Sequence, residues 1–78
     1  MIVRVHLYGM LKELIGNTVE LEVNAPLTGD IIISTFKIKF PQFNKTAFLI
    51  AVDHTLCSPN MEISSFNHIA LLPPVSGG

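Results

Sequence analysis

The chain has 78 residues, of which 49% are hydrophobic and 14% charged, and its formal net charge is −1. A chain of this length forms a single domain, and its apolar share supplies a core without disulfides, because the lone Cys57 has no intramolecular partner and suits a reducing cytoplasm. The sparse positive charge argues against nucleic acid as the main partner, and the longest apolar run, residues 47–52, is far shorter than the ~20 residues that a membrane helix needs. The same low charge indicates exposed apolar surface, and therefore a protein partner.

The first third of the chain shows three regular patterns. Residues 2–8 alternate between apolar and polar side chains, which predicts a half-buried strand. Apolar residues recur at helical spacing across residues 10–15, and Gly16 follows where a helix would end, so we expect a short helix there. Residues 19–23 alternate again and predict a second strand.

Residues 31–40 satisfy both a strand pattern and a helix pattern. Their many isoleucines and phenylalanines favour a strand by propensity. Every fourth residue from Ile32 onward is also apolar, however, while Thr28 or Asp30 is able to cap a helix and Pro41 is able to end it. Because β-branched residues cost only a few tenths of a kcal/mol each in a helix, packing can override their propensity. The residues alone leave both structures open.

The remaining elements are shorter. Residues 48–52 predict a buried central strand, Asp53 and His54 a turn, and residues 55–57 a short strand. A last strand over residues 68–72 runs into two prolines. Together these elements predict an α+β roll, with one mixed sheet of about four to five strands and one main helix across a face.

The body of the chain contains few side chains that point to chemistry. Those of metal-binding types are His6, His54, Cys57 and His68. Their spacing matches no paired-ligand motif, so we expect no metal site, with His6 on the exposed sheet face, His54 in a turn, and Cys57 buried and inert. Asp53, His54 and Ser58 do not predict a hydrolytic triad, because adjacent residues point apart and the chain has no nucleophile elbow. We therefore expect no active site in the body.

The most distinctive motif is at the end of the chain. It consists of Pro73, Pro74, Val75, Ser76, Gly77 and Gly78. Proline has no N–H to donate, so the pair ends the strand ladder and stiffens the exit, while the glycines leave the terminal carboxylate unhindered. Extended at ~3.5 Å per residue, the segment spans roughly 20 Å, enough to enter a deep cleft in another protein. We therefore predict a folded body over residues 1–72 and a flexible tail over residues 73–78 that serves as a substrate.

Three segments carry a resemblance to a known family. The ending from Ala70 to Gly78, the segment MLKELIG at residues 10–16 and the segment IAVDHTL at residues 50–56 resemble the small, sulfur-carrying subunit of molybdopterin synthase, in the MoaD-like family of ubiquitin-related proteins. The resemblance covers the whole chain, although only the tail motif is specific. It implies a ubiquitin-like β-grasp fold in which residues 28–40 form the main helix.

The resemblance also implies a function for the tail. In such proteins the terminal glycine, here Gly78, is adenylated with ATP by a separate E1-like adenylyltransferase and then converted to a thiocarboxylate. The tail enters the large synthase subunit, in a complex expected to be a heterotetramer, and gives its sulfur to a cyclic pyranopterin during molybdenum cofactor synthesis. The resemblance implies that Gly77, which has no side chain, lets the end of the tail fit a narrow channel in the partner. It also implies that the segment inside that channel consists of Pro73, Pro74, Val75 and Ser76. The chain itself would be a non-catalytic carrier that binds no cofactor, and we expect Leu72 to lie in an apolar patch that anchors the partner.

Three alternatives stay open at this point. A sulfur carrier for thiamine synthesis or tRNA thiolation would share the glycine pair, although the diproline followed by Val75 and Ser76 favours the molybdenum pathway. A ubiquitin-like modifier that attaches to lysines through Gly78 would begin with the same activation step. An interaction domain with an idle tail would keep its function without Gly77 and Gly78.

Overall fold

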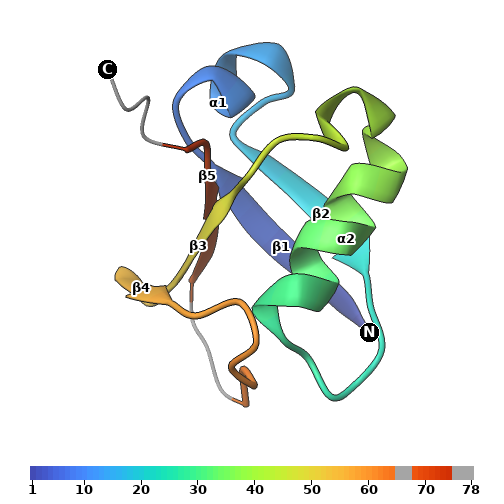
Figure 1. Cartoon of the computed structure of the whole chain (residues 1–78), viewed down its shortest axis with the longest axis vertical. Helices are drawn as coiled ribbons and strands as arrows, with labels where there is room; N and C mark the ends of the chain where they lie inside the picture. Colours follow the sequence, from blue (N-terminus) through green and yellow to red (C-terminus); the bar gives the residue numbers. More distant parts are fainter. Residues whose placement is uncertain (65–67, 75–78) are drawn as a thin grey trace.

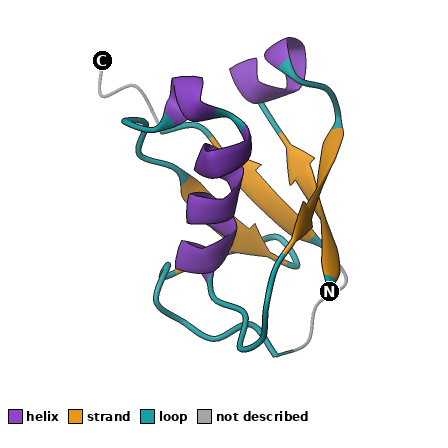
Figure 2. Ribbon diagram, turned by 90° about the vertical axis from the view of Figure 1, so that its right-hand side faces the viewer, coloured by secondary structure: helices purple, strands orange, loops and turns teal. Residues whose placement is uncertain are grey.

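The computed structural model describes residues 1–64 and 68–74. Figure 1 shows their elements in chain order, which are β1 (Ile2–Leu7), α1 (Met10–Leu14), β2 (Thr18–Glu22), α2 (Gly29–Lys39), the 3₁₀ turn η1 (Pro41–Phe43), β3 (Leu49–Val52), β4 (Thr55–Cys57) and β5 (Ile69–Leu72). The described strands form one five-stranded sheet of order β2-β1-β5-β3-β4, and α2 crosses one of its faces (Figure 2). The α+β roll predicted from the sequence is confirmed.

The strand pairing brings the two ends of the chain together. β1 is antiparallel to β2 and parallel to β5, and β5 is antiparallel to β3. The first and last strands therefore lie side by side within the sheet. Residues 48–52 were expected to form the central strand, but β3 lies second from the edge, because β5 inserts between β1 and β3.

The helical alternative for residues 28–40 is confirmed. The side chain of Thr28 caps α2 by accepting a hydrogen bond from the N–H of Ile31 at 3.2 Å. Ile32 and Phe36 are fully buried against the sheet, and the helix ends just before Pro41. The burial of these large side chains outweighs their small preference for a strand.

Phe36 is the centre of an aromatic cluster between α2 and the sheet. Its ring centroid lies 4.9 Å from that of Phe40, 5.4 Å from that of Phe48 and 5.9 Å from that of Phe43. Such ring pairs add to the stability that their buried area already supplies. The cluster anchors α2 to the loop that leads into β3.

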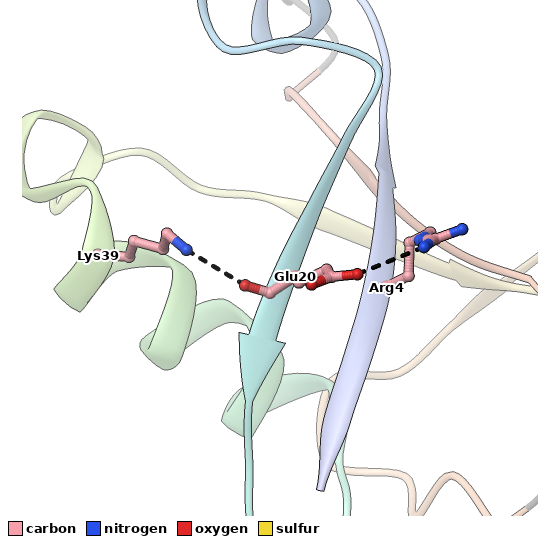
Figure 3. Close-up of polar contacts among 3 residues, drawn as sticks. All are labelled: Arg4, Glu20 and Lys39. Carbon is pink, nitrogen blue, oxygen red and sulfur yellow. Dashed lines mark hydrogen bonds and ion pairs between the residues drawn. The ribbon is translucent and has the colours of Figure 1, made fainter.

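A polar contact also ties α2 to the sheet at the surface. Arg4 and Glu20, on neighbouring strands, form an ion pair at 3.3 Å, and the Nζ of Lys39 donates to the backbone carbonyl of Glu20 at 3.3 Å (Figure 3). Both side chains of the ion pair are largely exposed to solvent, so the contact contributes little to stability. The fold depends on its apolar core.

One sequence expectation needs correction. Cys57 is half-buried rather than buried, because β4 is a short strand at the edge of the sheet, where Leu56 is 63% exposed. The short helix expected over residues 10–15 is present as α1, in which Leu11 is buried while Met10 and Leu14 are exposed. In the described residues no helix is long and apolar enough to cross a membrane.

Candidate functional site

The two faces of the sheet differ in their coverage. Because side chains alternate along a strand, Val3, Val5 and Leu7 of β1 point toward α2 and are buried. The same alternation sends neighbouring side chains to the other side, which we call the open face. The open-face residues of the central strands and their flanks are Arg4, His6, Tyr8, Leu49, Ala51, Leu56, His68, Ala70 and Leu72.

An apolar groove of about 450 Å³ lies on the open face. It is lined by Tyr8, Leu49, Ala51, His54, Leu56, His68, Ala70 and Leu72. Leu49 and Leu72 are directly paired across β3 and β5, and Leu49 is 37% exposed. Among the described residues that line this groove, none carries a carboxylate or an ammonium group, so its floor suits apolar side chains of another molecule.

The start of the tail lies against the turn between β1 and α1. Pro73 directly follows the last residue of β5, and a Cβ added to Gly9 would lie 3.0 Å from its Cγ. Gly9 has φ +60° and ψ −137°, a conformation that favours glycine. Gly9 thus lets the turn approach Pro73 closely and supports the direction in which the chain leaves the sheet. The sequence signal for it was a glycine between a predicted strand and a predicted helix.

The predicted tail residues are only partly placed by the structure. Leu72 and Pro73 are half-buried and Pro74 is exposed, so the chain emerges from the sheet at Pro74. Leu72 lines the groove and directly precedes Pro73. Val75, Ser76, Gly77 and Gly78 lie outside the described residues.

Three histidines from distant parts of the sequence meet on the open face. The ring centroids of His6 and His68 are 3.9 Å apart, with 17° between the ring planes. His54 stacks on the other side, at 4.7 Å from His68 and 23°. The hydroxyl of Tyr8 lies 3.2 Å from Nε2 of His68, within hydrogen-bonding distance. We call His6, His68 and His54 the histidine ladder. His6 on the exposed face and His54 in a turn agree with the sequence analysis, but their contact with His68 was missed.

The ladder is a stack rather than a ligand set. Within the described ranges, no group of three histidine, cysteine or acidic side chains is arranged to hold a metal ion. Partial burial, and then the neighbouring His68, Arg4 and His54, lower the pKa of His6 below its ordinary value. The stacked arrangement therefore favours an uncharged His6.

The topology defines a class of protein. A mixed sheet whose first and last strands are parallel neighbours, with one helix across a face, is the β-grasp of ubiquitin-like proteins. The chain belongs to the ThiS family, whose model matches residues 5–78. This membership and the structural likenesses below confirm the resemblance to ubiquitin-related sulfur carriers found in the sequence.

Two solved structures are similar along nearly the whole chain. SAMP1 from Haloferax volcanii has a TM-score of 0.77 and 18% identity, with 100% of both chains covered. The putative molybdopterin converting factor, subunit 1, from Pyrococcus furiosus has a TM-score of 0.78 and 20% identity, with 96% of this chain and 99% of that chain covered. At these identities the likenesses establish the fold. No curated protein sequence matches the chain.

Proposed function

We propose that this chain is the sulfur-carrier subunit of molybdopterin synthase. One observation carries the proposal: Leu72 lines an apolar groove, and Pro73 follows it directly. In this ThiS-family chain, a tail of sequence Pro-Pro-Val-Ser-Gly-Gly therefore starts beside that groove. The likeness to a protein described as a subunit of molybdopterin converting factor supports the same pathway. The chain acts in the cytoplasm as a carrier that binds no cofactor, and ATP is used by an E1-like adenylyltransferase.

The proposed chemistry begins at the carboxylate of Gly78. A carboxylate is a poor electrophile, so one of its oxygens first attacks the α-phosphorus of ATP and pyrophosphate leaves. A hydrosulfide ion supplied by other proteins then attacks the carbonyl carbon, AMP leaves, and loss of the sulfur-bound proton gives a thiocarboxylate. Gly77 and Gly78 have no Cβ to obstruct either approach. The large synthase subunit then receives the tail through residues 73–76, and docking of the body raises the effective concentration of the sulfur near a cyclic pyranopterin.

The groove on the open face is the proposed docking surface for the large subunit. Leu72 lines the groove beside its cross-strand partner Leu49, and Leu49 and Leu56 offer exposed apolar area. A partner side chain that fills the groove would fix the body while the tail extends into the active site. Docking at this one surface would therefore direct the carboxylate of Gly78 toward the active site of the partner.

Two further functions use the same first step. The ThiS family match favours a carrier for thiamine synthesis or tRNA thiolation as the second candidate. A ubiquitin-like modifier would instead transfer Gly78 to lysines of other proteins. The test is to mix the thiocarboxylated chain with the large subunit and cyclic pyranopterin, and to look for the dithiolene product. Its absence, together with sulfur in thiamine or tRNA or with Gly-Gly remnants on lysines, would assign the alternative.

A further inference from the structure

The histidine ladder joins three separate parts of the fold. His6 is in β1, His68 directly precedes β5, and His54 is in the turn between β3 and β4. His68 is the middle ring, so it touches both of the others. The ladder therefore connects the turn to the first and last strands across the open face.

Backbone contacts couple the ladder to the turn. The N–H of Asp53 donates to the carbonyl of His68 at 2.7 Å, and the N–H of His68 donates to the Asp53 carboxylate at 2.8 Å. Asp53 and His54 both have positive φ, at 51° and 70°, which is the sign that the two central residues of a type I′ hairpin turn require. His68 therefore contacts the turn through its backbone as well as through its ring.

The ladder also forms part of the groove. His54 and His68 line it together with Tyr8, whose hydroxyl reaches His68. When these rings move, the groove changes shape at the end formed by the turn. The ladder and the wall of the groove thus share the side chains of His54 and His68.

We propose that the histidine ladder is a proton-operated switch that holds the turn between β3 and β4 against β5 while its rings are neutral and releases it when more than one ring is protonated. Two cationic rings about 4 Å apart repel each other, which favours their separation. Release moves His54 and His68 out of the groove wall and weakens binding of apolar partners on this face. The switch is a property of the fold and does not depend on the function proposed above.

Among the described residues, few charged groups lie near the ladder. The titratable and charged groups that face it from the neighbouring elements are Arg4 of β1, Tyr8 directly after β1, Lys12 of α1, Glu20 of β2 and Asp53 of the turn. Glu20 is paired with Arg4, and the Asp53 carboxylate accepts from the backbone of His68. Arg4 adds positive charge beside His6, and burial and its neighbours lower the pKa of His6. These neighbours oppose proton uptake by His6.

The test is an NMR titration of the full chain from about pH 8 to about pH 5, on both sides of the ordinary imidazole pKa of about 6.5. We expect His6 to titrate below that value and the three titration curves to be broader than single-site curves. Amide protection factors of Asp53 and His68, each taken relative to the intrinsic exchange rate at that pH, should fall about fivefold on acidification, the factor that corresponds to two unit charges ~4 Å apart in water.

Three variants test whether the histidine ladder causes the pH dependence of the Asp53 amide. His68→Gln removes the middle ring, so the titration of His6 should return toward its ordinary value and the pH dependence of the Asp53 amide should disappear. His54→Gln keeps one stacked pair and should narrow the curves, which provides a second variant if the first does not fold. Arg4→Gln leaves all three rings in place, so in this variant the protection of the Asp53 amide should still depend on pH.

Three results would overturn the proposal. One is independent titration of all three histidines at the ordinary value with unchanged protection at Asp53. Another is a pH dependence that survives in His68→Gln. The third is a titration that shifts when a chelator or zinc is added, because the ladder would then be a metal site. The function proposed above could stand in each case, since it rests on Gly78.

Discussion

The covered and open faces of the sheet use the same strands for different purposes. In β5, Ile69 and Leu71 point toward α2 and are fully buried, while Ala70 and Leu72 point to the open face and line the groove. The covered face combines large apolar side chains with the aromatic cluster of α2 and supplies the stability of the fold. The open face keeps apolar side chains where another molecule can reach them. Alternation along a strand therefore lets one segment stabilise the domain and present a site next to the tail.

A change on the covered face should have the largest effect on stability. Phe36→Ala removes the centre of the aromatic cluster and should lower the free energy of unfolding by about 3–5 kcal/mol. Ile38→Ala, on the exposed side of the same helix, should change it by less than about 0.5 kcal/mol. Urea unfolding of both variants measures the difference. Equal effects would show that α2 is not anchored through Phe36.

A change in the groove should affect association more than stability. Leu72→Asp places a charge in the proposed docking surface, and we expect at least a tenfold weaker association with the large subunit, corresponding to roughly 1.4 kcal/mol or more. Ile38→Asp, on the far side of the domain, is the matched control and should bind normally. Calorimetric titration checks the affinity and circular dichroism checks the fold. An unchanged affinity would remove Leu72 from the interface.

A change at the tail exit should have an intermediate effect. Gly9→Ala forces a side chain into a left-handed backbone conformation, at a cost of order 1–3 kcal/mol, and pushes its Cβ against Pro73. Gly16→Ala carries similar strain at φ +139°, but nothing lies within 4 Å of its Cβ. We expect both variants to lose stability in thermal unfolding and only Gly9→Ala to slow adenylation. Similar adenylation rates would show that Gly9 does not direct the tail.

Acidification should have the smallest effect on global stability. The pKa of His6 is lowered in the folded chain, so the unfolded chain takes up a proton first as the pH falls. The stabilising contribution is therefore complete above about pH 6.5 and is lost below it. Urea unfolding across this range should show a modest decrease for the natural chain and a smaller one for His6→Gln. A stability that rises on acidification would contradict the direction of the shift.

The sequence predicted the elements better than the contacts between them. Alternation identified β1 and β2, whereas the residues alone left α2 open between helix and strand, and the family resemblance indicated the helix. The histidine ladder was missed because it depends on the parallel pairing of β1 with β5, which joins His6 to His68 across the whole length of the chain. Cys57 was expected to be buried because local hydrophobicity does not show that β4 lies at an edge.

The sequence likewise predicted some residues of the candidate site and missed others. The patch at Leu72 followed from its position before the prolines, whereas the partners that complete the groove, such as Leu49 and Leu56, come from a different hairpin. Their contribution depends on strand order, which composition and periodicity do not specify. The roles of Gly77 and Gly78 stay predictions, since these residues lie outside the described part of the chain.

The central claim concerns the carboxylate of Gly78, and intact-mass spectrometry tests it most directly. The chain is incubated with the cognate activating enzyme, ATP and a sulfur donor, alongside a chain that lacks Gly77 and Gly78 and a second carrier that proves the enzyme competent. We predict that the mass of the natural chain increases by the difference between one sulfur and one oxygen atom, while the truncated chain is unchanged. An unchanged mass for the natural chain, with the second carrier converted, would contradict the account.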